Sequence, residues 1–118
     1  IGGGFFDGAS IAKALALGAD AVFMGSAMLG ALGCIACDLC YLGKCPKGIT
    51  TQDEELAKHL DIETASQNAA NYIKNCTEEI KMIAGAVGHN NVHKLAKDDL
   101  RALTREMAKI TKVRLIGE

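Results

Sequence analysis

The sequence contains no tryptophan, one proline, two tyrosines and three phenylalanines. This shortage of aromatic side chains leaves few platforms on which single-stranded bases could stack. The sequence also lacks an excess of charge of either sign, because thirteen basic and fourteen acidic residues give a net charge of −1. The basic residues form no continuous stripe, so we expect no nucleic acid among the partners.

A long hydrophobic run is missing as well. The uncharged stretch 21–37 has seventeen residues and is interrupted by Gly25, Ser26, Gly30 and Gly33. A membrane-spanning helix needs about 20 consecutive apolar residues. We therefore interpret this stretch as a buried strand followed by a buried helix, and we expect no membrane contact. No signal-peptide pattern is visible, which favours a cytoplasmic location.

The composition is that of a globular protein. The 118 residues are 49% hydrophobic and 23% charged, and the mass of 12.4 kDa suits one domain. The chain opens on Ile1-Gly2-Gly3-Gly4 without an initiator methionine. We expect it to be a piece of a longer protein.

The first third alternates between strand and helix patterns. Residues 1–8 are glycine-rich and are interpreted as a strand end and a loop, while 9–18 are rich in helix-forming Ala and Leu. Residues 19–25 are short and apolar, as buried parallel strands are. Residues 26–32 predict a short helix capped by Ser26. The β–α–β–α order is typical of a parallel sheet or barrel.

The rest of the chain is predicted to be helical. After a loop over 33–50, Asp53 can cap a short helix that ends near His59, where a cation suits the helix dipole. Apolar residues at steps of three and four predict a long helix over 63–87, ended by Gly88. A solvated polar connection over 89–97 follows. The prediction ends with a last helix over 98–111, whose apolar face is made of Leu100, Leu103, Met107 and Ile110.

Four of the five cysteines lie within twelve residues. Cys34, Cys37, Cys40 and Cys45 form the pattern C-x2-C-x2-C-x4-C, followed by Pro46. The bacterial ferredoxin pattern, C-x2-C-x2-C-x3-C-P, is one residue shorter before its last cysteine. A short loop of thiolates can wrap an iron–sulfur cluster. Such clustering indicates metal binding in a reducing compartment more than a disulfide scaffold.

Two other interpretations of this loop stay open. Zinc sites usually use two separated C-x2-C pairs, and these cysteines form one continuous run. In the second interpretation, the four cysteines bind no metal and are simply reduced thiols. The fifth cysteine, Cys76, falls on the apolar face of the long helix and is interpreted as a buried thiol.

The glycine-rich start suggests a phosphate site. It misses the dinucleotide fingerprint G-x-G-x-x-G by one place, and no acidic residue ends the next strand. Two successive loops, Gly3-Gly4 and Gly25-Ser26, each precede a predicted helix. Their backbone N–H groups could hold one phosphate, as loops after the last strands of (β/α)8 barrels do. Ordinary tight turns explain the same glycines equally well.

These features together resemble one family. The segment GG-x5-S-IAKALALGADAVFMGSAMLGALGCIAC-x2-C-x4-CPKGITTQDEEL is similar to the FMN-binding synthase domain of glutamate synthase. The part Lys13–Gly25 is shared in looser form with other flavin barrels, whereas Cys45–Asp53 is more particular to this family. The resemblance continues to about residue 105.

The resemblance implies a fold and its organisation. The fold is α/β, the C-terminal portion of a (β/α)8 FMN-binding barrel, here its last two βα units. Residues 1–33 would end the barrel, 34–52 would form the iron–sulfur loop and 53–118 the C-terminal helices. A complete barrel needs roughly 250 residues.

The resemblance also implies two cofactors. The family carries a 3Fe–4S cluster on cysteines spaced C-x5-C-x4-C, which match Cys34, Cys40 and Cys45. Cys37 lies at a position that the family does not require, so a 4Fe–4S cluster stays open, with 3Fe–4S favoured by the spacing. Gly3, Gly4, Gly25 and Ser26 match the FMN-phosphate loops. The family's Ile-Arg pair is replaced by Phe5-Phe6, which removes a cation from that neighbourhood.

The implied function is part of a flavin- and iron–sulfur-dependent glutamate synthase. This enzyme carries out reductive amination of 2-oxoglutarate with glutamine-derived ammonia. The chain would supply the cluster loop and the phosphate loops, and we expect it to be inactive alone. The expected partners are the remainder of the barrel or other synthase subunits, and an electron donor, either ferredoxin or an NAD(P)H-linked subunit. Self-association into a homo-oligomer is a further expectation. No catalytic residue is identified, and the alternative is a small ferredoxin-like electron-transfer module.

Overall fold

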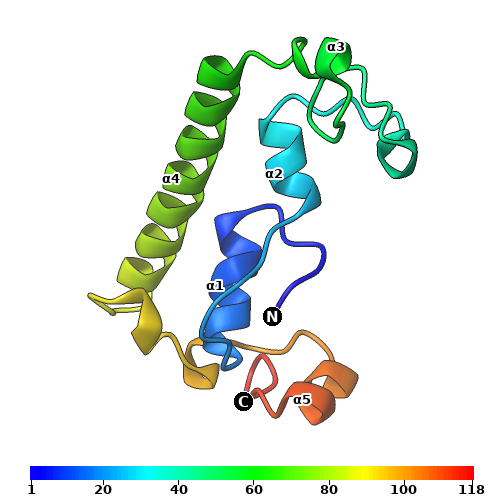
Figure 1. The fold of residues 1–118 in the computed structure, drawn as a ribbon. Coiled ribbons are helices and arrows are strands. Elements are labelled where there is room, and N and C mark those ends of the chain that lie inside the picture. Colours follow the sequence, from blue (N-terminus) through cyan, green and yellow to red (C-terminus); the bar gives the residue numbers. More distant parts are fainter. The chain divides into compact units, whose positions relative to one another are not determined.

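The computed structural model describes residues 1–118, which form helices and loops without a β-strand (Figure 1). The chain divides into two compact units, 1–23 with 75–118 and 24–74, which are described separately. None of the helices combines the length and the apolar character that crossing a bilayer requires. The five α-helices are α1 (Gly8–Ala16), α2 (Ser26–Ala31), α3 (Glu54–Ala57), α4 (Ile62–Ala86) and α5 (Arg105–Thr111).

Helix α1 confirms the helix predicted over 9–18. The carboxylate of Asp7 caps it, because its Oδ1 accepts the Ser10 backbone N–H at 2.6 Å. This hydrogen bond is the main reason why the pKa of Asp7 is lowered. The alanine-rich sequence that follows loses little side-chain entropy in a helix, and the helix ends at Ala16, before Gly18.

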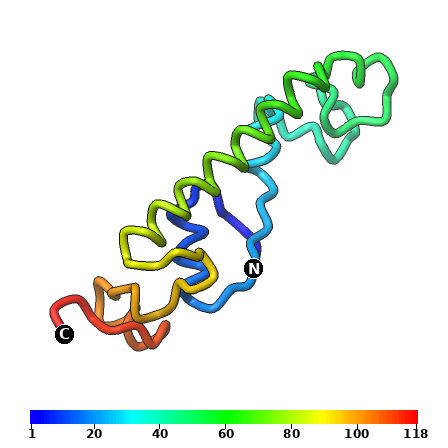
Figure 2. The backbone as a smooth tube through the Cα atoms, turned by 90° about the vertical axis from the view of Figure 1, so that its left-hand side faces the viewer, coloured from blue at the N-terminus to red at the C-terminus, as the bar shows by residue number.

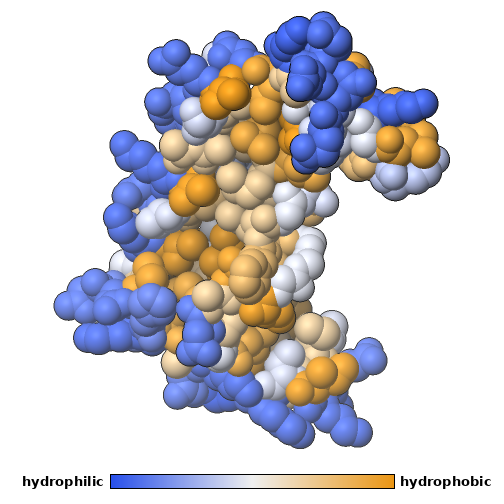
Figure 3. Space-filling view, viewed as in Figure 1, coloured by the Kyte–Doolittle hydropathy of each residue, from blue (hydrophilic) through white to orange (hydrophobic).

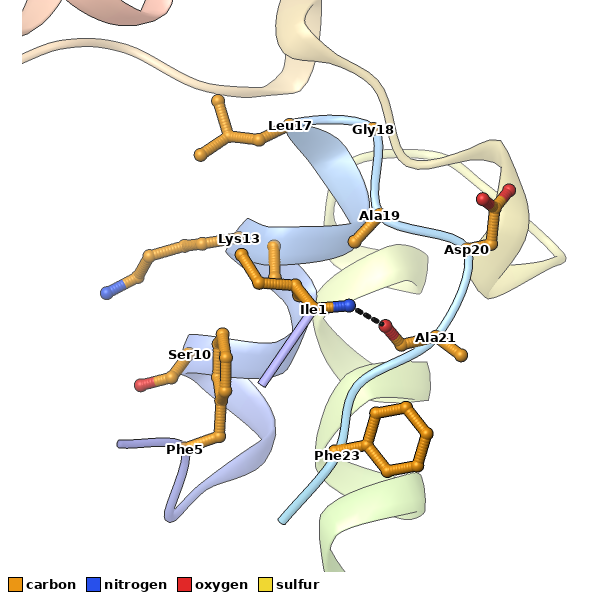
Figure 4. Close-up of a pocket in the computed structure, with 11 residues that line it drawn as sticks. Ile1, Phe5, Ser10, Lys13, Leu17, Gly18, Ala19, Asp20, Ala21 and Phe23 are labelled. Atoms are coloured by element: carbon orange, nitrogen blue, oxygen red, sulfur yellow. Dashed lines mark hydrogen bonds between the residues drawn. The ribbon is translucent and has the colours of Figure 1, made fainter. Parts of the chain in front are cut away.

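The strand predicted over 19–25 is not formed. Only one parallel bridge joins Gly2 to Phe23, with the Phe23 N–H donating to the Ile1 carbonyl at 2.8 Å. The Ile1 ammonium group donates to the Ala21 carbonyl at 3.0 Å, as Figure 4 shows. A parallel pair without further strands beside it is too weak to extend a ladder, and Phe23 remains 80% exposed. The β–α–β alternation therefore survives only as one parallel bridge between the residues on either side of α1.

Helix α4 confirms the long helix predicted over 63–87, and Figure 2 shows it without interruption. In the first unit, its second half packs against α1. The core of this contact is small and apolar, made of Ala12, Ala16, Ala84 and Leu95. Small side chains let the two helix backbones approach closely, which favours this pairing.

Gly8 marks the closest approach between α1 and α4. A Cβ atom built at this position would lie 2.7 Å from the Cys76 carbonyl oxygen and 2.7 Å from the Glu79 Cβ. The Gly8 N–H donates to Glu79 Oε2 at 2.7 Å. The start of α1 is therefore held on α4 by a contact that a larger residue would block.

The last helix is shorter than the predicted 98–111. Residues Lys97–Asp99 form a 3-10 turn, and Ala102 pairs with Leu115 in a parallel bridge. The Thr104 hydroxyl accepts the Met107 N–H at 3.2 Å and so sets the start of α5 at Arg105. A local side-chain cap thus overrides the apolar periodicity that suggested an earlier start.

The polar connection is anchored, whereas the sequence predicted it to be solvated. His89 Nε2 lies 2.8 Å from Asp99 Oδ2, and the two side chains are 27% and 16% exposed. The Ala96 N–H donates to the same carboxylate at 2.8 Å, and this bond, with His89, lowers the pKa of Asp99. The end of α4 is thereby tied to the C-terminal segment.

The apolar face predicted for the last helix is uncovered in this chain. Hydrophobic side chains reach the surface in several places (Figure 3). In and beside α5, Leu103 is 77% exposed, Ile110 68% and Met107 50%. These apolar side chains of the predicted amphipathic helix are therefore present, and nothing in this chain covers them.

In the second unit, the structure confirms the cap of α3 and corrects that of α2. Asp53 Oδ1 accepts the N–H groups of Glu55 at 2.9 Å and Leu56 at 3.1 Å. Ser26 is the first residue inside α2, and its side chain makes no capping hydrogen bond. Gly25 occupies the cap position in its place.

We expect Gly8→Ala to destabilise the first unit by about 1–3 kcal/mol, because its methyl group would overpack the backbone of α4. Gly85→Ala is the matched control, since a Cβ at this α4 position meets nothing within 4 Å. It should be neutral or stabilising by up to about 1 kcal/mol. Thermal denaturation followed by circular dichroism measures both. Equal melting temperatures for Gly8→Ala and the wild type would contradict the packing described.

Candidate metal centre

The cysteine loop follows α2 and confirms the loop predicted over 33–50, apart from one 3-10 turn at Cys40–Leu42. Its backbone turns repeatedly through the left-handed region, with positive φ at Gly33, Ala36, Asp38, Gly43 and Gly48. Two of these residues, Ala36 and Asp38, have side chains, and each costs about 1–2 kcal/mol in this conformation. Such strain is concentrated at functional sites in proteins. Here it brackets Cys37.

The four predicted ligands differ in exposure. Cys34 and Cys37 are partly buried, Cys40 is exposed and Cys45 is buried, and all are free thiols. The Ala36 N–H donates to Cys34 Sγ at 3.4 Å. The structure brings no three histidine, cysteine, aspartate or glutamate side chains together as a metal-binding group. The loop therefore carries the four sulfur atoms without bringing three of them together at one point.

Cys45 has surroundings suited to a thiolate. Its side chain is 5% exposed. The backbone N–H of Thr50 is the main cause of a lowered pKa of the Cys45 thiol, which falls to about 7 although burial opposes the shift. The N–H groups of Ile49 and Lys47 lower it further. Hydrogen bonds to the charged form are what stabilise a buried thiolate.

The Thr50 hydroxyl supports the same conclusion. Its oxygen is buried and makes no hydrogen bond of ordinary geometry. It is near enough to Cys45 to contribute to the lowered thiol pKa. A buried hydroxyl without a partner is costly, and a charged sulfur ligand would give it one. The donors around Cys45 therefore fit a metal-bound thiolate.

The turn after Cys45 is packed on α3. The Gly48 N–H donates to the Cys45 carbonyl at 3.1 Å, and φ at Gly48 is +74°. A Cβ at Gly48 would lie 2.7 Å from the Leu56 carbonyl oxygen and 3.0 Å from that of Ala57. His59 Nδ1 lies 3.0 Å from the Pro46 carbonyl oxygen. The sequence suggested only a helix-end cation at His59, and no local pattern indicated its contact thirteen residues away.

The predicted phosphate loops lie in different units. In the first unit, Gly3 and Gly4 both have positive φ, and a Cβ at either meets nothing within 4 Å. Glycine is therefore favoured at both positions by the backbone conformation, whereas the space around them would admit a side chain. In the second unit, Gly25 and Ser26 begin α2. The arrangement of the two loops about a phosphate stays a prediction.

The start of α1 is already filled by carboxylates. Asp7 accepts the Ser10 N–H, and Glu79 accepts that of Gly8. A phosphate at this helix start would meet two negative charges, so the first turn of α1 does not fit one. A pocket in the same unit has a mainly apolar lining (Figure 4). Its lining residues include Ile1, Phe5, Lys13, Leu17 and Phe23, but neither Gly3 nor Gly4.

Comparison with known proteins shows the family. Residues 1–90 match the family described as the conserved region in glutamate synthase, and the chain belongs to this family. It is 48% identical to the archaeal-type glutamate synthase (NADPH) of Thermotoga neapolitana over 95 residues, which are 80% of this chain and 19% of that protein.

Two further relatives match nearly the whole chain. The glutamate synthase large subunit-like protein of Rhizobium meliloti is 45% identical over 133 residues, covering 99% of this chain and 30% of that protein. The archaeal glutamate synthase (NADPH) of Methanocaldococcus jannaschii is 43% identical, covering 98% and 24%. The chain therefore spans less than a third of the length of these relatives. No solved structure matches it.

In the cluster-free chain, we expect the Cys45 thiolate to form with a midpoint near pH 7, below the value of about 8.5 for a free cysteine. Because the folded pKa is the lower one, the thiolate's contribution to stability is complete above the unfolded pKa. It is lost as the pH falls through about 7. The rate of Cys45 alkylation by iodoacetamide, followed by peptide mass spectrometry across pH, measures the midpoint. A midpoint at the free-cysteine value would contradict the hydrogen bonding described.

Proposed function

We propose that this chain is the iron–sulfur segment of a glutamate synthase, together with the end of its FMN-binding barrel. The observation that carries the proposal is the donor set around Cys45, within a chain whose family is glutamate synthase. The parallel bridge between Gly2 and Phe23, which lie on either side of α1, is consistent with the last βα units of a barrel. The missing neighbouring strands would then belong to the rest of the protein.

In this proposal, Cys34, Cys40 and Cys45 hold a 3Fe–4S cluster. The four thiols lie on one short loop whose backbone is strained on either side of Cys37, and a run of cysteines on a short loop suits iron–sulfur clusters. Cys37 is the spectator, although its position leaves a 4Fe–4S cluster as the alternative. When bound, the cluster would supply one-electron transfer. The chain's own part is to bury Cys45 and to direct backbone N–H groups at its sulfur.

FMN is the second proposed cofactor. Its phosphate would rest on the backbone of Gly3, Gly4, Gly25 and Ser26. It would not use the first turn of α1, where Asp7 and Glu79 already accept the N–H groups. Phe5 and Phe6 supply no cation to replace the arginine expected from the resemblance. FMN binding would therefore depend on the remaining barrel residues.

The reaction proposed for the whole protein is reductive amination of 2-oxoglutarate with glutamine-derived ammonia. The names of two of the relatives specify NADPH, which favours a nicotinamide-linked electron donor over ferredoxin. This chain contains no group identified with ammonia release. It would therefore be inactive without the remaining barrel or partner subunits, with or without self-association.

Iron and acid-labile sulfide, measured with EPR on anaerobically reconstituted protein, test the proposal. We expect about three irons per chain and a signal in the oxidised state. Cys45→Ser should lose the cluster, whereas Cys37→Ser should retain it. Cys76→Ala is the matched control, because Cys76 is a buried thiol on α4 in the other unit.

The alternative outcomes are distinct. About four irons, EPR-silent until reduction and lost in Cys37→Ser, would replace the 3Fe–4S assignment by 4Fe–4S. That result would favour the ferredoxin-like module if flavin binding were also absent. No iron after reconstitution would contradict the proposed function.

A further inference from the structure

Two contacts join the turn after Cys45 to the end of α3. Gly48 packs against the carbonyl groups of Leu56 and Ala57, so closely that a Cβ would lie 2.7–3.0 Å from them. His59 Nδ1 lies 3.0 Å from the Pro46 carbonyl oxygen. A carbonyl oxygen can only accept, so Nδ1 carries the proton and donates.

The donor His59 lies in the turn that follows α3. Asp53 caps the first turn of α3, and the His59 backbone N–H donates to the Leu56 carbonyl at 3.0 Å. The imidazole ring therefore projects from a turn that is fixed at both ends. Because this turn is held in place, the exposed side chain of His59 can orient the turn that contains Pro46.

The peptide geometry links His59 to the cysteine. The Pro46 carbonyl and the Lys47 N–H belong to one peptide unit, and the chain contains no cis peptide bond. In a trans peptide, the carbonyl and the N–H point in opposite directions. When His59 holds the Pro46 carbonyl on one side, the Lys47 N–H is directed to the other side, and this N–H is one of the groups that lower the pKa of the Cys45 thiol.

We propose that His59 is a positioning residue that orients the Pro46–Lys47 peptide and so directs the Lys47 N–H at the sulfur of Cys45. The consequence for the cluster rests on the proposed function. Hydrogen bonds to cluster sulfurs raise the reduction potential, since they stabilise the more negative reduced state. His59 would thus adjust the potential of a cluster that it does not touch.

The first test needs no cluster. Amide hydrogen exchange of Lys47, measured by NMR on the full cluster-free chain, should accelerate about fivefold in His59→Ala, as expected for the loss of one hydrogen bond. His59→Asn should restore the wild-type rate, because the asparagine side-chain N–H can replace Nδ1–H. His93→Ala is the matched control, since His93 is an exposed histidine of the other unit.

The second test uses the cluster-loaded protein. The reduction potential, measured by EPR-monitored titration, should shift to more negative values in His59→Ala and return in His59→Asn. An unchanged Lys47 exchange rate in His59→Ala would overturn the proposal, and so would a changed rate with an unchanged potential. Failure of the wild type to bind iron would contradict the proposed function alone, because the exchange test is independent of the cluster.

Discussion

Close approach of one backbone to another, at positions where only glycine fits, is the constraint on which both units depend. Gly8 lets the start of α1 lie against the Cys76 carbonyl of α4, and Gly48 lets the turn after Cys45 lie against the end of α3. In each case the polar groups nearby are paired across the contact, through Glu79 in the first unit and His59 in the second. The glycines therefore make room for hydrogen bonds that fix the geometry.

The proposed cluster loop follows the same logic. Thiolate ligands need donors that stabilise negative charge in a buried place, and backbone N–H groups supply these without adding a charged side chain. Three such groups, those of Thr50, Ile49 and Lys47, lower the pKa of Cys45 to about 7. In the arrangement that we propose, His59, which follows α3 and is not a ligand, positions one of these N–H groups.

Much of the local structure could be predicted from the sequence. The helix over 9–18, the cap at Asp53, the long helix α4 and the loop over 33–50 were all indicated by short-range patterns, and the structure confirms them. Two predictions were wrong for a shared reason. The strand over 19–25 and the early start of the last helix depended on apolar patterns alone. A strand needs paired neighbours, and the cap at Thr104 outweighs apolar periodicity.

By itself, the sequence determined the family, the run of four cysteines and the positions of the glycines, because these are matters of residue type and spacing. Only the tertiary structure decided which groups surround Cys45, that His59 contacts Pro46, and that Asp7 and Glu79 together occupy the start of α1. Glu79 meets Gly8 across 71 residues, and His59 meets Pro46 across thirteen. Contacts at such separations arise from packing, and no local pattern encodes them.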